Sequence, residues 1–223
     1  MDIFWYVFFG FLWYQVIAIF GLSMGLHRYF CHKQFKASKT YEIISLTLAT
    51  LAGARSPLGW IGTHRIHHAY ADTDKDPHSP DFLGFWNILF NRWTMNDLWS
   101  FDKRKFIKDL TKNPRIMFFH KYHNYIHIGV ALISLLLGIE FFIIFIVIPF
   151  ILGVFGYGLF NAAGHKDYKP RTNFWINILS AGEGFHDIHH KNPRQFRLHK
   201  YDISGFIIER FLNEKETRSP KLS

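Results

Sequence analysis

The feature that most constrains the fold of this chain is a long apolar stretch near its start. Residues 3 to 26, with the sequence IFWYVFFGFLWYQVIAIFGLSMGL, contain no charged side chain. At about 1.5 Å per residue, a helix of this length crosses a hydrocarbon core of about 30 Å. The stretch lacks the basic start, the short apolar region and the small-residue cleavage pattern of a signal peptide. It therefore predicts a membrane-spanning helix.

A second apolar block covers residues 122 to 163. The sequence LGIE, from Leu137 to Glu140, interrupts this block with a glycine and with the only charge that the block contains. Such an interruption is typical of a tight turn. The block therefore predicts two antiparallel helices, at about 122–138 and 141–163, and it brings the number of predicted transmembrane helices to three.

The basic residues indicate how these helices are oriented. All 26 Lys and Arg residues lie at positions 28–121 and 166–221, outside the two apolar blocks. A further segment, at about 41–58, carries Glu42, Arg55 and Pro57 among apolar residues. If it crossed the membrane, the two basic regions would face opposite sides, against the positive-inside rule. We therefore expect an amphipathic interfacial helix at 41–58, an N-terminus outside, and the histidine-rich regions and C-terminus in the cytosol.

These segments predict an all-α integral membrane protein with a single domain over residues 1–223. The helix at 3–26 precedes a cytosolic cap, 27–121, and the hairpin at 122–163 precedes a second cytosolic part, 164–223. A net charge of +9 is also found in nucleic-acid-binding proteins. Here the basic residues flank apolar helices, so we expect a lipid bilayer and no nucleic acid as partner. The single cysteine excludes an internal disulfide and a site of several thiolates.

Most of the 14 histidines fall into a repeated pattern. The first box is HRYFCH, the second is HRIHH and the third is HDIHH, and NAAGH lies between the last two. Because positions i, i+3 and i+4 share one face of a helix, each HxxHH box presents three imidazoles together. NAAGH places Asn161 one helical turn before a histidine. The histidines of the pattern are His27, His32, His64, His67, His68, His165, His186, His189 and His190.

This number of imidazoles predicts a site for two metal ions, because one zinc ion takes only three or four protein ligands. Iron, zinc, copper and nickel all accept imidazole, so the ligand type alone leaves the metal open. A soluble carboxylate-bridged di-iron bundle is excluded, since the chain has a single ExxH pair, from Glu183 to His186. The metalloprotease signature HExxH is absent as well.

Three segments of the chain resemble the membrane fatty acid desaturases, most closely the acyl-CoA Δ9 (stearoyl-CoA) type. They are GLSMGLHRYFCHKQFKA, WIGTHRIHHAYADTDKDPHSP and GEGFHDIHHKNP, and FNAAGH is similar to the additional Asn and His of that family. The likeness runs from about Gly21 to Arg197. It implies that the histidines of the pattern bind two irons and that Asn161 holds one iron through a water.

The resemblance implies an O₂-dependent removal of two hydrogens from an unactivated acyl chain carried by CoA, a carrier protein or a phospholipid. A separate donor, such as a ferredoxin or cytochrome b5, would supply two electrons, because no HPGG-type cytochrome module follows the third box. Trp60 matches a family position that lines the acyl tunnel, although an interfacial anchor is an alternative role. Relatives of this type usually begin with one more membrane helix, so three spans are expected here instead of four.

Four polar residues near the boxes are candidates for orienting the histidines: Asp72, Asp76, His78 and Glu183. We expect them to accept hydrogen bonds from the imidazole rings, and turn capping by the aspartates is the alternative. A calcium loop at 72–78 is excluded because the glycine and the terminal glutamate of that motif are missing. His120, His123 and His127 share one helical face, and we expect them to anchor a helix at the membrane interface.

Two other functions remain alternatives to a desaturase. A hydroxylase of lipids, alkanes or carotenoids would use a similar histidine-rich membrane site and add oxygen to its product. A non-catalytic metal-binding or metal-transport protein would place its ligands along a path near the midplane of the bilayer. The boxes lie outside the apolar segments, which favours an enzyme.

Overall fold

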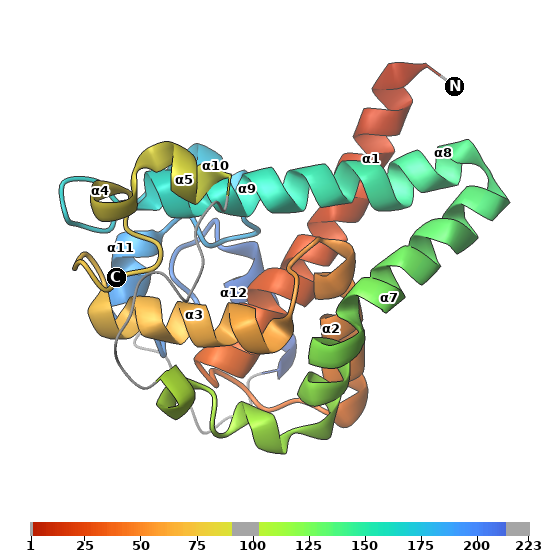
Figure 1. The fold of residues 1–223 in the computed structure, drawn as a ribbon. Helices are drawn as coiled ribbons and strands as arrows, with labels where there is room; N and C mark the ends of the chain where they lie inside the picture. The colour runs from red at the N-terminus through yellow and green to blue at the C-terminus, as the bar shows by residue number, and fades with distance from the viewer. Residues whose placement is uncertain (1, 91–102, 213–223) are drawn as a thin grey trace.

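The computed structural model describes residues 2–90 and 103–212 of the chain. The first apolar stretch forms one continuous helix, in which α1 (Ile3–Ile17) is followed by the π-helical η1 (Ala18–Cys31) (Figure 1). This helix extends beyond its predicted end at residue 26, so His27 and Arg28 lie in its last turns. The described residues contain isolated β-bridges but no strand, and the prediction of an all-α chain is confirmed for them.

The second apolar block forms the predicted hairpin. Its elements are α7 (Pro114–Leu137), α8 (Ile139–Phe142), η4 (Ile143–Val147) and α9 (Ile148–Gly164). The last three make one continuous helix, which meets α7 at Gly138 (Figure 1). Gly138 has a φ of 140°, a conformation that residues with a side chain rarely adopt. The turn therefore lies where the LGIE sequence predicts it.

α7 begins earlier than the sequence predicts. The Asn113 side chain accepts hydrogen bonds from the amides of Arg115 and Ile116, and Pro114 occupies the first helical position. Two of the described helices are long and apolar enough to cross a membrane, Ile3–Cys31 and Ile139–Gly164. α7 differs from these two helices because its first half is polar.

The predicted single helix at 41–58 is wrong, because two helices cover this segment. α2 (Lys39–Leu51) ends before a break in which Gly53 and Arg55 have φ angles of 73° and 58°. α3 (Pro57–Tyr70) then begins behind a cap formed by the Ser56 side chain. Pro57 is well suited to the first position of a helix and poorly suited to its interior, so it begins α3 and disfavours one helix through the whole segment. The whole second histidine box therefore lies on α3.

Short helices complete the part of the molecule that holds the histidines. They are α4 (Pro80–Leu83), α5 (Phe85–Leu89), η2 (Lys103–Phe106), η3 (Leu110–Lys112), α10 (Phe174–Leu179), α11 (His186–Lys191), α12 (Ile203–Ile207) and η5 (Ile208–Leu212). α11, in the blue C-terminal part of the chain, lies between α3 and α9 in Figure 1. α2 packs against η1, where a side chain at Gly21 would overlap the backbone of α2 at Ala49.

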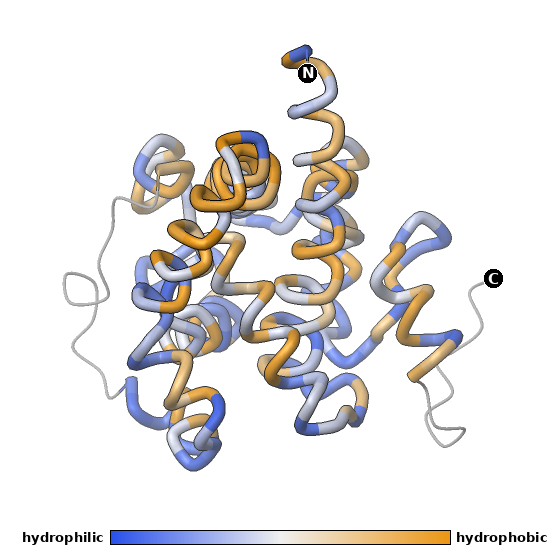
Figure 2. Tube along the Cα trace, turned by 90° about the vertical axis from the view of Figure 1, so that its right-hand side faces the viewer, coloured by the Kyte–Doolittle hydropathy of each residue, from blue (hydrophilic) through white to orange (hydrophobic). Residues whose placement is uncertain are grey.

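The long helices leave many apolar side chains exposed. Ile3 on α1 and Leu136 on α7 are 80% and 88% exposed, and Phe150 and Ile151 on α9 are also exposed. Figure 2 shows hydrophobic residues along the long helices and hydrophilic residues in many of the turns. Exposed apolar surface of this extent marks contact with lipid or with another protein.

Candidate metal centre

The helices η1, α3 and α11 and the end of α9 bring the predicted histidines together. His27 lies in the last turns of η1, and His32 follows the end of this helix. α3 carries the second box and α11 carries the third. His165 follows the last residue of α9. Four segments that are distant in the sequence therefore place their imidazoles in one region of the fold.

The nine imidazoles divide into two groups, and within each group the ring nitrogens lie within 4.8 Å of one another. The first cluster contains His27, His32, His64, His68 and His189. The second cluster contains His67, His165, His186 and His190. Asn161 lies on α9, one turn before His165, and lines an adjacent cavity.

Each HxxHH box contributes to both clusters. On α3, His64 and His68 are four residues apart and belong to the first cluster, whereas His67 belongs to the second. On α11 the arrangement is reversed, because the pair that is four residues apart belongs to the second cluster and His189 belongs to the first. Each cluster therefore takes two histidines from one of these helices and one from the other. The helical spacing alone does not predict this division.

The ring nitrogens of the second cluster are arranged as metal ligands would be. Nε2 of His165 lies 2.8 Å from Nε2 of His186, and Nε2 of His67 lies 3.1 Å from Nε2 of His190. Nδ1 of His67 donates to Asp76 and Nδ1 of His165 donates to Asp72, so both Nε2 atoms carry lone pairs. Ligand nitrogens about 2.1 Å from a metal and at right angles would lie about 3 Å apart. A cation between the rings fits this geometry.

The first cluster has the same spacing. Nε2 of His189 lies 3.0 Å from Nε2 of His27 and 2.9 Å from Nε2 of His68. Nε2 of His32 lies 3.0 Å from Nε2 of His64. Nδ1 of His27 is 2.9 Å from Oε2 of Glu183, which leaves its Nε2 directed into the cluster. Both groups of residues therefore fit a bound metal ion.

Burial keeps seven of the nine imidazoles neutral. It lowers the pKa of His32 to about 2 and the pKa of His190 to about 3, and neighbouring imidazoles contribute to the shift. Burial also lowers the pKa values of His64, His67, His68, His186 and His189. A neutral imidazole has a free lone pair, and it is the form that binds metals. The clusters therefore present metal-binding nitrogens at neutral pH.

The carboxylates predicted to orient the histidines lie against them. Asp76 accepts from His67 at 2.8 Å and also from the amides of Asp72 and His78. Asp72 accepts from His165 at 2.8 Å. The ring of His78 lies 5.0 Å from the ring of His67. A carboxylate that accepts a hydrogen bond from a metal-binding histidine fixes the tautomer and the orientation of its ring.

A family model described as fatty acid desaturase matches residues 3–203. The chain belongs to the fatty acid desaturase family. It is 34% identical to the sn-1 stearoyl-lipid 9-desaturase of Anabaena variabilis, over 80% of this chain and 69% of that relative. It is 32% identical to the acyl-CoA C20 Delta5-desaturase of Anemone leveillei, over 79% of this chain and 60% of that relative.

A third relative is the acyl-CoA Delta(11) desaturase of Spodoptera littoralis, which is 28% identical over 82% of this chain and 59% of its own length. The chain thus spans about six to seven tenths of the length of these curated relatives. All three relatives are named as desaturases, which are oxidoreductases.

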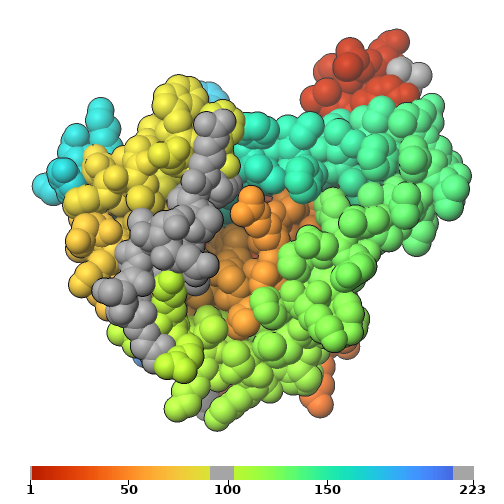
Figure 3. Space-filling model, viewed as in Figure 1, coloured from red at the N-terminus to blue at the C-terminus, as the bar shows by residue number. Residues whose placement is uncertain are grey.

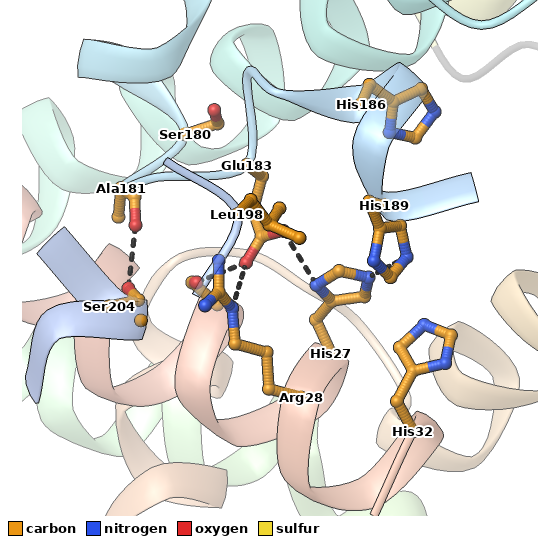
Figure 4. A network of polar contacts seen from close by, with 12 residues as sticks. His27, Arg28, His32, Ser180, Ala181, Glu183, His186, His189, Leu198 and Ser204 are labelled. Atoms are coloured by element: carbon orange, nitrogen blue, oxygen red, sulfur yellow. Dashed lines mark hydrogen bonds and ion pairs between the residues drawn. The ribbon is translucent and has the colours of Figure 1, made fainter. Parts of the chain in front are cut away.

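A buried ionic network supports the first cluster of this desaturase-family chain (Figure 4). The Arg28 side chain donates to Glu183 at 2.8 Å and makes two hydrogen bonds of 3.0 Å to Asp202. Burial alone would raise the pKa of the Glu183 carboxyl, but the charge and the hydrogen bond of Arg28 hold it well below its usual range. Ser23 also donates to Glu183. Glu183 is therefore a charged carboxylate beside His27.

The sequence prediction includes Glu183 but misses Arg28 and Asp202. Arg28 lies inside the first box, next to His27, and this position could have marked it as a residue of the site. Asp202 lies beyond the matching motifs, and its side chain caps α12 by accepting from the amide of Gly205. No spacing in the sequence links it to the histidines.

A cavity of about 840 Å³ lies beside the clusters of this desaturase-family chain. Figure 3 shows the surface hollowed between α7 and α9. Trp60 and Asn161 are among the residues that line the cavity. The Trp60 ring stacks on His64, with ring centroids 5.4 Å apart. His123 and His127 also line the cavity, and they lie outside both clusters. Nδ1 of His120, on the same helix, is 2.5 Å from the Ser56 hydroxyl. No sequence pattern indicates that the face of α7 with these histidines borders a cavity.

Proposed function

We propose that this chain is an O₂-dependent fatty acyl desaturase that introduces a cis double bond into a saturated acyl chain. The observation that carries the proposal is the largely apolar cavity of about 840 Å³ beside two clusters of imidazoles. Cavities of about 300–1,000 Å³ are usual for small-molecule ligands. An acyl chain in this cavity would have some of its methylenes next to the clusters and away from water.

The two clusters would bind two iron ions, and Asn161 would hold one of them through a water. Iron is favoured over zinc because the reaction is an oxidation and zinc has no redox chemistry. When bound, the irons supply the activation of dioxygen and the removal of hydrogen. The carboxylates and the cavity supply orientation and a dry environment.

The protein residues have distinct tasks in this proposal. Asp76 and Asp72 hold the protons on Nδ1 of their histidines, so that the Nε2 lone pairs stay directed into the second cluster. Trp60 stacks on His64 and lines the cavity, so it would hold the acyl chain against the first cluster. The apolar walls exclude water and fix the position of the chain, which lowers the entropy cost of the reaction.

We also propose three transmembrane helices, with α7 as the third beside Ile3–Cys31 and Ile139–Gly164. The N-terminus and the turn at Gly138 would lie outside, and the single domain would place residues 27–121 and 164–223 on the cytosolic side. The exposed apolar side chains of Ile3 and Leu136 support contact with a lipid bilayer. The clusters would then lie at the cytosolic ends of the membrane helices.

The proposed position of the double bond is Δ9, because the relatives from Anabaena variabilis and Synechocystis are named stearoyl-lipid 9-desaturases. The acyl group would be carried by CoA, a carrier protein or a lipid, since relatives are named for both acyl-lipid and acyl-CoA substrates. A separate protein, such as a ferredoxin or cytochrome b5, would donate the electrons.

Gas chromatography with mass spectrometry of host lipids tests this proposal. The gene is expressed in a strain that cannot make unsaturated fatty acids, together with a ferredoxin and its reductase. We expect a new monounsaturated acid that has lost two hydrogens, with the double bond at carbon 9, and no product with His67→Ala or His189→Ala. His199→Gln, outside the clusters, serves as the control and retains the product. A product that has gained oxygen would indicate a hydroxylase instead.

A further inference from the structure

Two short helices far apart in the sequence carry almost the same residues. α5 has the sequence FWNIL and α10 has the sequence FWINIL. In each helix the tryptophan is largely exposed, Trp86 by 64% and Trp175 by 76%. Exposed aromatic residues surround them, and we call the whole set the aromatic surface: Phe82, Phe85, Trp86, Tyr168, Phe174 and Trp175. The metal centre described above uses none of these side chains.

Both helices pack against the C-terminal part of α9 (Figure 1). α5 approaches so closely that a side chain at Gly158 would overlap the carbonyl oxygen of Leu89. The ring of Phe90, at the end of α5, lies 5.8 Å from the ring of Phe155, which is exposed on α9. The aromatic surface is therefore continuous with the exposed apolar face of a helix that is apolar enough to cross a membrane.

α10 is also fixed to the first apolar helix. The Tyr14 hydroxyl donates to the carbonyl oxygen of Leu179 at 2.6 Å, and the Gln15 side chain donates to the carbonyl oxygen of Ile178 at 3.1 Å. The carbonyls at the end of a helix have no partner within the helix. In a bilayer such groups must be satisfied by the protein. Two polar side chains of an otherwise apolar helix do this for α10.

The loop after α9 adds positive charge beside the aromatic surface. Lys166 and Lys169 are exposed there. The amide of Tyr168, between them, donates to Asp81 on α4 at 2.8 Å, and the rings of Tyr168 and Phe82 lie 5.6 Å apart. Tryptophan and tyrosine together with lysine are the residues that proteins place at the headgroup region of a membrane.

We propose that the aromatic surface lies in the headgroup region of the bilayer, on the side of the metal centre, and fixes the depth at which the clusters are held. The proposal rests on the membrane insertion proposed above. A lipid surface is favoured over a soluble protein partner because the aromatic surface joins the apolar face of α9 without a polar boundary at the Phe90–Phe155 contact. The surface would thus form a further contact with the membrane, in addition to the spanning helices.

Fluorescence quenching tests the proposal in vesicles that contain the full-length chain. The parent chain is compared with Trp86→Phe and Trp175→Phe, and the emission lost in each variant is assigned to the replaced tryptophan. Quenching is measured with lipids brominated near the headgroup, with lipids brominated near the methyl end, and with iodide in the water. Trp5→Phe is the matched control, because Trp5 is exposed on the N-terminal apolar helix.

We expect the emission of Trp86 and Trp175 to be lost mainly with the lipid brominated near the headgroup, and to be affected little by iodide. Quenching of both by iodide alone, with Trp5 quenched by brominated lipid, would overturn the proposal and leave membrane insertion intact. Protection from iodide only after a reduced electron carrier is added would also overturn it, in favour of a protein partner. If no brominated lipid quenched Trp5, Trp86 or Trp175, membrane insertion itself would be wrong.

Discussion

Asp76 connects the loop after α3 to the second cluster, because its carboxylate accepts from His67 and from two backbone amides. We predict that Asp76→Asn lowers metal affinity by about 10–100-fold, as is usual when the partner of a metal-binding histidine is removed. An amide can donate as well as accept, so it no longer enforces the proton on Nδ1 of His67. Competition with a chromophoric chelator measures this affinity.

Asp74→Asn is the matched control for this prediction. Asp74 lies two residues away in the same loop and is exposed. The substitution changes the same charge without removing a contact to a cluster histidine. Equal losses of affinity in the two variants would mean that the charge of the loop matters and that the hydrogen bond to His67 does not.

The identities of the candidate ligands could be read from the sequence, because helical spacing and the family motifs both select the same histidines. The division of these histidines between two clusters could not. Spacing shows that His64, His67 and His68 share one broad face of a helix, but it does not show which neighbouring helix each ring meets. The contact between Arg28 and Asp202 could not be predicted for a similar reason, because only the tertiary fold brings the two residues together.

Glu42, on α2, makes contacts to η1 and to the start of α7. It accepts from Arg115 at 2.5 Å and Asn113 at 3.1 Å, and from the hydroxyl of Tyr29 at 2.8 Å. Burial alone would raise its pKa, but these hydrogen bonds and the charge of Arg115 lower it below the usual 4.5. The stabilisation is therefore present above about pH 4.5 and is lost as the pH falls through the folded-state pKa.

We predict that Glu42→Gln lowers the melting temperature at pH 7, and that its difference from the wild-type chain shrinks when the pH is lowered below 4.5. Thermal unfolding of the purified chain in detergent, followed at several pH values, measures this difference. A difference that stayed constant from pH 7 to pH 4 would show that the carboxylate charge of Glu42 does not stabilise the contact between α2 and α7.

The packing of α5 on α9 depends on Gly158, because a side chain there would overlap the carbonyl oxygen of Leu89. We predict that Gly158→Ala destabilises the chain by about 1–3 kcal/mol, the usual cost of overpacking a close contact. Gly129→Ala is the control, since a side chain at Gly129 meets no atom within 4 Å. Thermal unfolding compares the two variants, and equal melting temperatures would contradict the close approach of α5 to α9.

Long apolar elements could be predicted well from the sequence, whereas elements set by local capping could not. The turn at Gly138 follows from one glycine and one charge in an apolar block. The break between α2 and α3 depends instead on the left-handed backbone at Gly53 and Arg55. The early start of α7 likewise depends on the Asn113 cap.

The proposed sidedness of the molecule can be tested by labelling single introduced cysteines in intact cells. Glu140→Cys lies at the turn between α7 and α9, and Lys200→Cys lies on the opposite side of the proposed bilayer. The one native cysteine, Cys31, is buried and gives little background. We predict that a membrane-impermeant maleimide labels Glu140→Cys in intact cells and labels Lys200→Cys only after permeabilisation. The reverse pattern would contradict the proposed orientation.

The fold class and the convergence of the boxes could be predicted at the level of the whole molecule, because charge distribution and histidine placement point to the same arrangement. The family resemblance implies a tunnel lined by Trp60, but the outline of the cavity could not be predicted. The cavity forms where α7 and α9 diverge from their turn and where the α2–α3 break supplies Ala52 to Ser56 as lining. Its shape depends on the angles between helices, which the sequence pattern does not specify.

The central claim is that neighbouring histidines of one box bind different metal ions. Its most direct test is the iron content of the purified chain after anaerobic loading with Fe(II), measured by mass spectrometry of the metal. We predict about two irons per chain, since nine imidazoles exceed the ligand number of one ion. His68→Ala, in the first cluster, and His67→Ala, in the second, should each retain about half of that content, and His199→Gln all of it. The double variant His67→Ala/His68→Ala should retain almost none, whereas half of the content in the double variant would mean that both histidines bind the same ion. A wild-type content of one iron per chain or less would contradict the two-metal centre.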